Sequence, residues 1–148
     1  MNKITAFIID DSDIDRYIAG RVLNRSEAVG GVEEVSDGVE GLDMLSNRDE
    51  FTKRFSPIPP RPLIFLDINM PGMNGFEMLA GIQKLKDDGL VDPQQDFVVV
   101  MLTSSADRQD REKSLAYDFV TEYVEKPLSV EKLHSLISTT YQEVKLPT

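Results

Sequence analysis

Residues 4–11 read Ile-Thr-Ala-Phe-Ile-Ile-Asp-Asp, a short apolar run that ends abruptly in two acidic residues. Two further runs share this pattern. Leu-Ile-Phe-Leu at 63–66 is followed by Asp67, and Phe-Val-Val-Val-Met-Leu at 97–102 is followed by Thr103. Continuous apolar runs of this length are typical of strands that are buried on both faces of a parallel sheet. The runs therefore predict the centre of such a sheet, with a polar side chain at the end of each strand.

Helical patterns and weaker strands alternate with these runs. Apolar residues at helical spacing predict helices at about 13–24, 38–45, 76–85, 108–117 and 130–144. Gly30-Gly31 reads as a break before a weak second strand at 32–35, and a last strand is expected at 122–124. This alternation implies an α/β domain, a doubly wound parallel sheet in three layers with helices on both faces.

Length and composition indicate one acidic domain. A chain of 148 residues with 41% apolar content suits a single globular domain, and the absence of cysteine excludes a disulfide framework. The formal charge of −10 disfavours phosphate backbones and anionic membranes, so we expect no direct nucleic-acid partner. The longest apolar run, 98–102, is too short to span a membrane and the N-terminus lacks the apolar stretch of a signal peptide, so we expect no membrane association and a cytoplasmic location. Four prolines predict a long surface loop at about 47–62. We expect the whole chain, 1–148, to form a single domain with a core at about 3–141, and we expect no output domain to follow it.

Polar side chains gather where the predicted strands end. In an open parallel sheet, functional residues lie outside the carboxyl ends of the strands. The residues at these ends are Asp10, Asp11, Asp67, Thr103 and Lys126. Clustered carboxylates repel one another unless a cation balances them, and hard oxygen ligands favour Mg²⁺. Such a cluster lets a carboxylate attack a phosphoryl group whose oxygens contact Lys126 and Thr103, so the sequence predicts a phosphoryl-transfer site.

Four segments together resemble the receiver domain of response regulators in bacterial two-component signalling, and in particular the single-domain, chemotaxis-regulator-like members. These segments are Asp10-Asp11, Asp67 to Gly75, Leu102-Thr103-Ser104 and Lys126-Pro127. The resemblance implies a flavodoxin-like fold with strand order 2-1-3-4-5, five strands and five helices.

The resemblance also implies the roles of the acidic residues. Asp67 corresponds to the phosphoacceptor of the family, which takes its phosphoryl group from a histidine kinase or a histidine phosphotransfer protein. The metal ion, Mg²⁺ with Mn²⁺ as an alternative, would be bound by Asp67, directly by Asp11, mainly through water by Asp10, and by the backbone carbonyl of Asn69.

Residues in or just after the last two strands correspond to the phosphate contacts and the switch. Lys126 and Thr103 match the family's phosphate-contacting residues, and Thr103 with Tyr123 matches its switch pair. The peptide bond before Pro127 is expected to be cis, as is usual in the family. An unknown downstream protein would bind the face built from the segments 108–117, 122–124 and 130–144.

The function implied is a single-domain response regulator, which accepts a phosphoryl group on Asp67 in a Mg²⁺-dependent reaction. It would catalyse its own phosphorylation and dephosphorylation without being a dedicated enzyme. Two alternatives remain open. Asp11-Ser12-Asp13 has the Asp-x-Asp spacing of haloacid-dehalogenase-like phosphatases, which would use Asp11 as nucleophile. The chain could also be an interaction domain that works without phosphorylation, with the acidic run serving only to cap a helix and Tyr123 serving only as a core aromatic.

Overall fold

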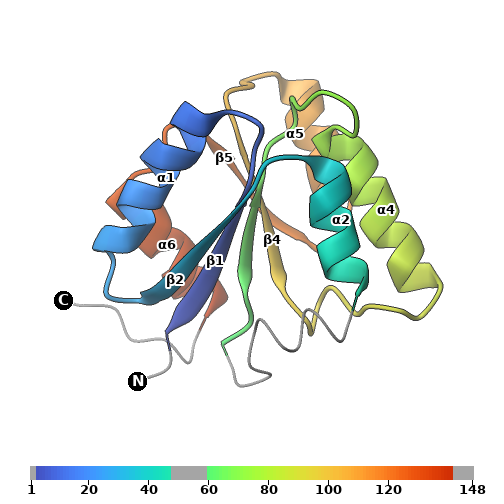
Figure 1. Ribbon diagram of the computed structural model, residues 1–148, viewed down its shortest axis with the longest axis horizontal. Coiled ribbons are helices and arrows are strands. Elements are labelled where there is room, and N and C mark those ends of the chain that lie inside the picture. The colour runs from blue at the N-terminus through green and yellow to red at the C-terminus, as the bar shows by residue number, and fades with distance from the viewer. Residues whose placement is uncertain (1–2, 48–59, 142–148) are drawn as a thin grey trace.

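The computed structural model describes residues 3–47 and 60–141, which build one parallel sheet covered by helices on both faces (Figure 1). The sheet has five strands in the order β2-β1-β3-β4-β5. Its strands are β1 (Ile4–Ile9), β2 (Val29–Val35), β3 (Leu63–Leu66), β4 (Val98–Thr103) and β5 (Val120–Glu125). This order confirms the predicted flavodoxin-like, doubly wound architecture.

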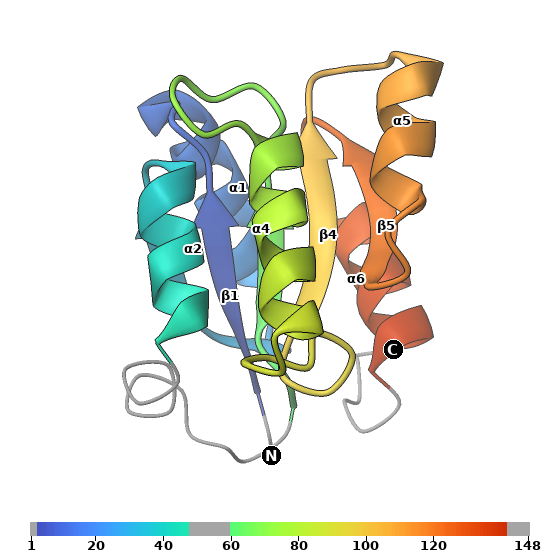
Figure 2. The ribbon, with the colours of Figure 1, turned by 90° about the vertical axis from the view of Figure 1, so that its right-hand side faces the viewer.

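Five helices complete the three layers within the described residues. They are α1 (Asp13–Arg25), α2 (Gly38–Ser46), α4 (Gly75–Asp87), α5 (Arg108–Leu115) and α6 (Val130–Thr140). Helices α1 and α6 cover one face of the sheet, and α2, α4 and α5 cover the other (Figures 1 and 2). Side chains along β1 alternate between the two cores: Phe7 packs in the cluster with Met44 and Met78, whereas Ile8 packs in the cluster with Leu23 and Leu133.

The carboxyl ends of the strands meet at one edge of the sheet. The arrowheads of β1 and β4 point to the same edge, at the top of Figure 2. The loop after β3 folds back on its own strand there, because the Gly75 N–H donates to the Ile68 carbonyl at 2.9 Å. A Cβ atom on Gly75 would lie only 2.4 Å from the backbone oxygen of Asp67, so the close return of this loop requires glycine.

The predicted break at Gly30-Gly31 is wrong, because both glycines lie inside β2. Ile4 pairs with Val29 and Thr5 pairs with Gly31, which leaves Gly30 as an extra residue in the ladder. A Cβ on Gly30 would approach the Lys3 Cβ to 2.8 Å. The glycines therefore mark an irregularity within the strand rather than the end of an element.

Other element boundaries differ from the prediction at their ends. Strand β5 begins at Val120 rather than 122, and α6 ends at Thr140 with Tyr141 as its C-cap, while residues from 142 onward lie outside the described part. Most of the proline-rich loop expected at 47–62, residues 48–59, also lies outside it. The described end of this segment is bonded to the domain, since the Arg61 carbonyl accepts from the Tyr141 hydroxyl at 2.8 Å. No helix of the described ranges is long and apolar enough to cross a membrane.

Candidate functional site

Three aspartates meet at the carboxyl ends of β1 and β3. The carboxylate oxygens of Asp10, Asp11 and Asp67 lie within 4.8 Å of one another. The sheet fixes two of these residues, because the Asp67 N–H donates to the Ile9 carbonyl and the Asp10 N–H donates to the Val35 carbonyl, each at 3.0 Å. Asp10 and Asp67 are buried and Asp11 is exposed, so the cluster opens to solvent on one side. This set of hard oxygen donors fits a divalent cation such as Mg²⁺ or Mn²⁺.

An ammonium group lies among these carboxylates. The Nζ atom of Lys126, which follows β5, is 2.7 Å from Asp10 Oδ2, 2.8 Å from Asp15 Oδ2 and 3.5 Å from Asp67 Oδ2. The backbone N–H of Lys126 donates to the Thr103 carbonyl at 2.8 Å, which ties the loop after β5 to the end of β4. The Lys126-Pro127 peptide bond is cis, as predicted.

The electrostatics of the site follow from burial and crowding. Burial and the neighbouring charge of Asp10 raise the pKa of Asp67. The charge of Lys126 and the nearby Thr103 hydroxyl lower this pKa, but they offset the rise only in part. Burial alone would lower the pKa of Lys126. The hydrogen bonds to Asp10 and Asp15 outweigh burial and raise the pKa of Lys126 to about 12. The lysine is therefore charged at every physiological pH.

Hydrogen bonds to Ser105 join the two predicted switch residues, Thr103 and Tyr123. Thr103 is fully buried, its hydroxyl lies close enough to Asp67 to lower the pKa of that carboxyl, and it accepts from the Ser105 N–H at 3.3 Å. The Tyr123 side chain is turned inward, and its hydroxyl donates to the Ser105 carbonyl at 2.8 Å. The guanidinium of Arg111 lies 5.7 Å from the centre of the Tyr123 ring. Thr103 and Tyr123 thus contact the same loop residue, Ser105, through its N–H and its carbonyl respectively.

The structure adds two residues that the sequence analysis did not select, Asp15 and Arg16. Asp15 holds Lys126, although its spacing from Ser12 suggests only a helix cap. Arg16 donates to the backbone carbonyl of Asp10 at 2.6 Å, and this hydrogen bond joins α1 to the acidic loop after β1. Asn69 is exposed beyond Asp67, and the metal contact of its carbonyl stays a prediction.

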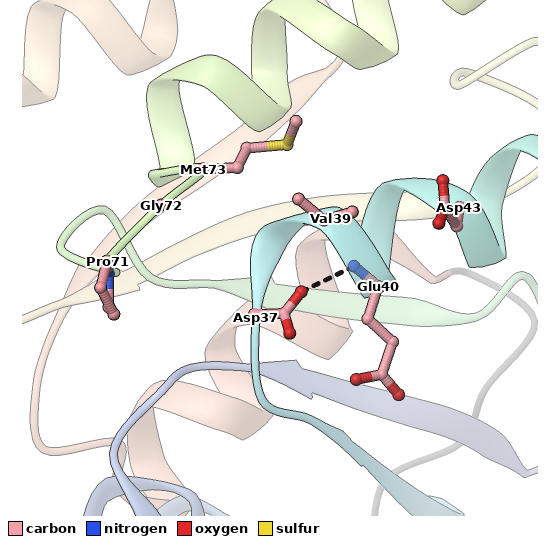
Figure 3. A pocket seen from close by; sticks show the side chains of 7 residues that line it. All are labelled: Asp37, Val39, Glu40, Asp43, Pro71, Gly72 and Met73. Atoms are coloured by element: carbon pink, nitrogen blue, oxygen red, sulfur yellow. Dashed lines mark hydrogen bonds between the residues drawn. The ribbon is translucent and has the colours of Figure 1, made fainter.

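A groove of about 480 Å³ lies beside the site, between the start of α2 and the loop after β3 (Figure 3). It is lined by Asp37, Val39, Glu40, Asp43, Pro71, Gly72 and Met73. In Figure 3 the Asp37 carboxylate accepts from the Glu40 N–H, a contact of 2.7 Å that caps α2. None of the three clustered aspartates lines this groove, so it is a surface feature separate from the acidic site.

Comparisons with known proteins agree with this geometry. Sensor histidine kinase CheAY from Helicobacter pylori is 30% identical over 129 residues, which cover 87% of this chain but only 14% of the kinase. The crystal structure of a two component response regulator from Cytophaga hutchinsonii is 29% identical, with a TM-score of 0.74 and coverage of 96% of this chain and 100% of that chain. The Mn(2+)-bound form of response regulator Rcp1 is 26% identical, with a TM-score of 0.64 and coverage of 98% and 99%.

The family of the chain follows from its sequence, fold and site together. The response regulator receiver domain matches residues 6–138, which include the acidic cluster, the lysine and every described strand except the first residues of β1. The strand order and the cis peptide bond are those that the resemblance to this family implied. The chain therefore belongs to the response regulator receiver domain family of two-component signalling.

Proposed function

We propose that Asp67 accepts a phosphoryl group and that phosphorylation switches the binding of this chain to a partner protein. A receiver domain is a signalling module and not a dedicated enzyme. The observation that carries the proposal is the position of Asp67, which is buried, lies within the acidic cluster and has the Lys126 ammonium at 3.5 Å. A carboxylate placed this way combines a nucleophilic oxygen with a cation for the incoming phosphoryl oxygens.

The chemistry requires no general base. One Asp67 oxygen forms a bond to phosphorus while the bond from phosphorus to the donor's imidazole nitrogen breaks, and that nitrogen keeps the electron pair. The Lys126 ammonium neutralises an oxygen of the transferred group, and the Thr103 hydroxyl, which lies beside Asp67, donates to another. Mg²⁺ bound by Asp10, Asp11, Asp67 and the Asn69 carbonyl would supply the remaining positive charge.

The surface around the site supports a protein as phosphoryl donor. Ile14 and Tyr17, on the first turns of α1 next to the acidic cluster, are 71% and 63% exposed. Large apolar side chains exposed together are typical of protein-binding surfaces. We therefore propose a histidine kinase or a histidine phosphotransfer protein as donor. The named relative CheAY is itself a sensor histidine kinase.

The face proposed for the downstream partner is hollowed. A groove of about 530 Å³ lies between α5, β5 and α6, and its lining includes Arg111, Tyr123 and Lys132. Because Tyr123 lines this groove and its hydroxyl also bonds to Ser105, in the loop that follows Thr103, a change at Asp67 has a route to the partner face. The cytoplasmic location and the absence of an output domain stay predictions.

Intact mass after incubation with acetyl phosphate tests the proposal. We expect one phosphoryl adduct on the wild type in the presence of Mg²⁺ and none without it. Asp67→Asn should abolish the adduct, because the amide is no nucleophile at this position. Asp13→Asn is the matched control, since Asp13 is an exposed acid outside the cluster and its loss should leave the adduct in place.

The other outcomes separate the alternatives. An adduct that survives Asp67→Asn but is lost in Asp11→Asn would identify Asp11 as the nucleophile, as the phosphatase hypothesis predicted, although membership of the receiver family argues against that hypothesis. A wild type that gives no adduct with Mg²⁺ would favour the interaction domain that works without phosphorylation.

A further inference from the structure

We propose that Asp15 is a positioning residue for the chemistry at Asp67, because it competes with the phosphoryl group for the ammonium of Lys126. The inference rests on the proposed function, since it assumes that Asp67 carries the phosphoryl group. Three observations support it: the local bonds of α1, the donors of Lys126 and the different exposure of its partners.

The first observation is that the Asp15 carboxylate is not used to cap its own helix. Ser12 is the N-cap of α1, and its side chain accepts from the Asp15 N–H at 3.2 Å. In a full capping box the acid three residues after the cap would accept the N–H of the cap residue. Here the Ser12 N–H donates to Asp10 Oδ1 at 2.9 Å instead, and the Asp15 carboxylate is directed to Lys126.

The second observation concerns the donors of Lys126. Its ammonium has three N–H groups, and two of them are taken by Asp10 and Asp15 at 2.7 and 2.8 Å. Asp67 Oδ2, at 3.5 Å, forms an ion pair with Lys126 but lies at the outer limit of a hydrogen bond. A phosphoryl group on Asp67 adds about −1.5 to −2 charge and three strong acceptor oxygens. The ammonium, which is held 3.5 Å from Asp67 Oδ2, is drawn toward that group, and this movement lengthens its contact with one of its two present partners.

The third observation decides which partner gives way. The side chain of Asp10 is 2% exposed, whereas that of Asp15 is 38% exposed. A carboxylate that loses its ion pair is stabilised by water if it is exposed, but a buried one keeps an uncompensated charge. Lys126 therefore leaves Asp15 rather than Asp10 when the phosphoryl group arrives. Asp15 holds the lysine back in the unmodified protein and weakens its contact with the phosphoryl group.

The test is the affinity for beryllium fluoride, a non-covalent mimic of a phosphoryl group on a carboxylate, measured by titration calorimetry in saturating Mg²⁺. Asp15→Asn removes the competitor and should tighten binding about three- to tenfold, which corresponds to about 0.7–1.4 kcal/mol. Asp13→Asn removes the same charge from the same helical turn, but Asp13 is 90% exposed and pairs with Arg16. This control should bind within about twofold of the wild type.

A double-mutant cycle separates competition for the lysine from a simple change of charge. In a Lys126→Met background, Asp15→Asn should have no more effect than Asp13→Asn, because no ammonium is left to compete for. An Asp15→Asn effect of full size in that background would overturn the proposal. If the Lys126→Met protein does not bind beryllium fluoride, the affinity of an Asp15→Glu variant of the wild type is measured instead. It restores a carboxylate and should return the affinity toward the wild-type value, and failure to do so would overturn the proposal.

The wild-type result distinguishes this inference from the proposed function. A wild type that takes up no phosphoryl group from acetyl phosphate and binds no beryllium fluoride would contradict the proposed function and the inference together. A wild type that is phosphorylated on Asp67, with an Asp15→Asn protein that binds the probe no more tightly, would contradict the inference alone.

Discussion

The first turns of α1 and α4 share one sequence pattern, a polar N-cap followed three residues later by an acid, and use it differently. In α4, the Asn74 side chain accepts from the Glu77 N–H at 2.8 Å, and the Glu77 carboxylate accepts from the Asn74 N–H at 3.1 Å. This reciprocal capping box satisfies two N–H groups that a helix start would otherwise leave unpaired. In α1, Ser12 and Asp15 form only the first of these two bonds.

The missing half of the capping box in α1 is explained by the site. Asp10 supplies the acceptor for the Ser12 N–H, and the Asp15 carboxylate is therefore available to bind Lys126. The helix start nearer the lysine thus replaces a local bond with one that joins residues 111 positions apart in the sequence. The comparison shows that a polar N-cap followed three residues later by an acid stabilises one helix on its own and forms part of a charged site at the other.

The largest difference between the two helix starts is expected at their first helical residues. Gly75→Ala in α4 would place a Cβ atom 2.4 Å from the Asp67 carbonyl oxygen and 2.8 Å from the Ile68 Cα, and backbone atoms cannot easily yield. We expect the free energy of unfolding to fall by about 3 kcal/mol in urea denaturation. Asp13→Ala in α1 alters a side chain that is 90% exposed and should change it by about 0.5 kcal/mol. Equal losses in the two variants would show that the return of the loop after β3 is not the constraint.

A second difference is expected at alkaline pH. The ion pair between Asp15 of α1 and Lys126 is lost when the lysine loses its proton, whereas the capping box of α4 contains no group that titrates in this range. The folded-state pKa of Lys126, about 12, is above its ordinary value of 10.5. Its stabilising contribution is therefore fully present below pH 10.5 and is lost as the pH rises through 12. The shift corresponds to about 2 kcal/mol at most.

The alkaline prediction needs a difference measurement, because Tyr123, whose pKa burial raises, also destabilises the fold as the pH rises past 10. Urea denaturation of the wild type and of Lys126→Met at a series of pH values removes this shared contribution. The stability of the wild type relative to Lys126→Met should decline between pH 10.5 and 12. A difference that stays constant over that range would contradict the proposed strength of the Lys126 ion pairs.

Most of the fold could be predicted because its central strands are marked twice, by apolar runs and by the polar residue that ends each run. Strand β3 begins and ends where the apolar run 63–66 does, and β4 is displaced from its run by only one residue. The ends of the parallel strands meet at one edge, so Asp10, Asp67 and Lys126 converged as expected. Gly30 could not be assigned in the same way, because a glycine in a bulge and a glycine in a turn look alike in sequence.

The contribution of Asp15 lay beyond the sequence for a similar reason. Ser12 and Asp15 match a capping box, and the local interpretation is complete without a distant partner. Only the three-dimensional position of Lys126 shows that the carboxylate is directed elsewhere. The same holds for Ser105, whose carbonyl binds the Tyr123 hydroxyl, because a backbone acceptor has no signature in the residue type.

The smallest expected effect is a loss of stability at the start of α4 that leaves binding at the acidic site unchanged. Glu77→Gln keeps a side-chain acceptor three residues after the cap of α4 but removes the negative charge from the positive end of the helix dipole. We expect a loss of about 0.3–1 kcal/mol in the free energy of unfolding, measured in urea. The affinity for beryllium fluoride should stay at the wild-type value, because the Glu77 carboxylate is bonded to its own helix cap.

Asp15→Asn is the partner of this variant at the other helix start, since it makes the same chemical change at the same helical position of α1. The dipole contribution is also the same, so a stability loss of similar size is expected, with a further loss from the broken ion pair to Lys126. Only this variant should bind the probe more tightly. If Glu77→Gln tightened binding as much as Asp15→Asn, the loss of a negative charge at either helix start would be enough to raise the affinity, without any contact with Lys126. The two first turns would then differ in structure but not in function.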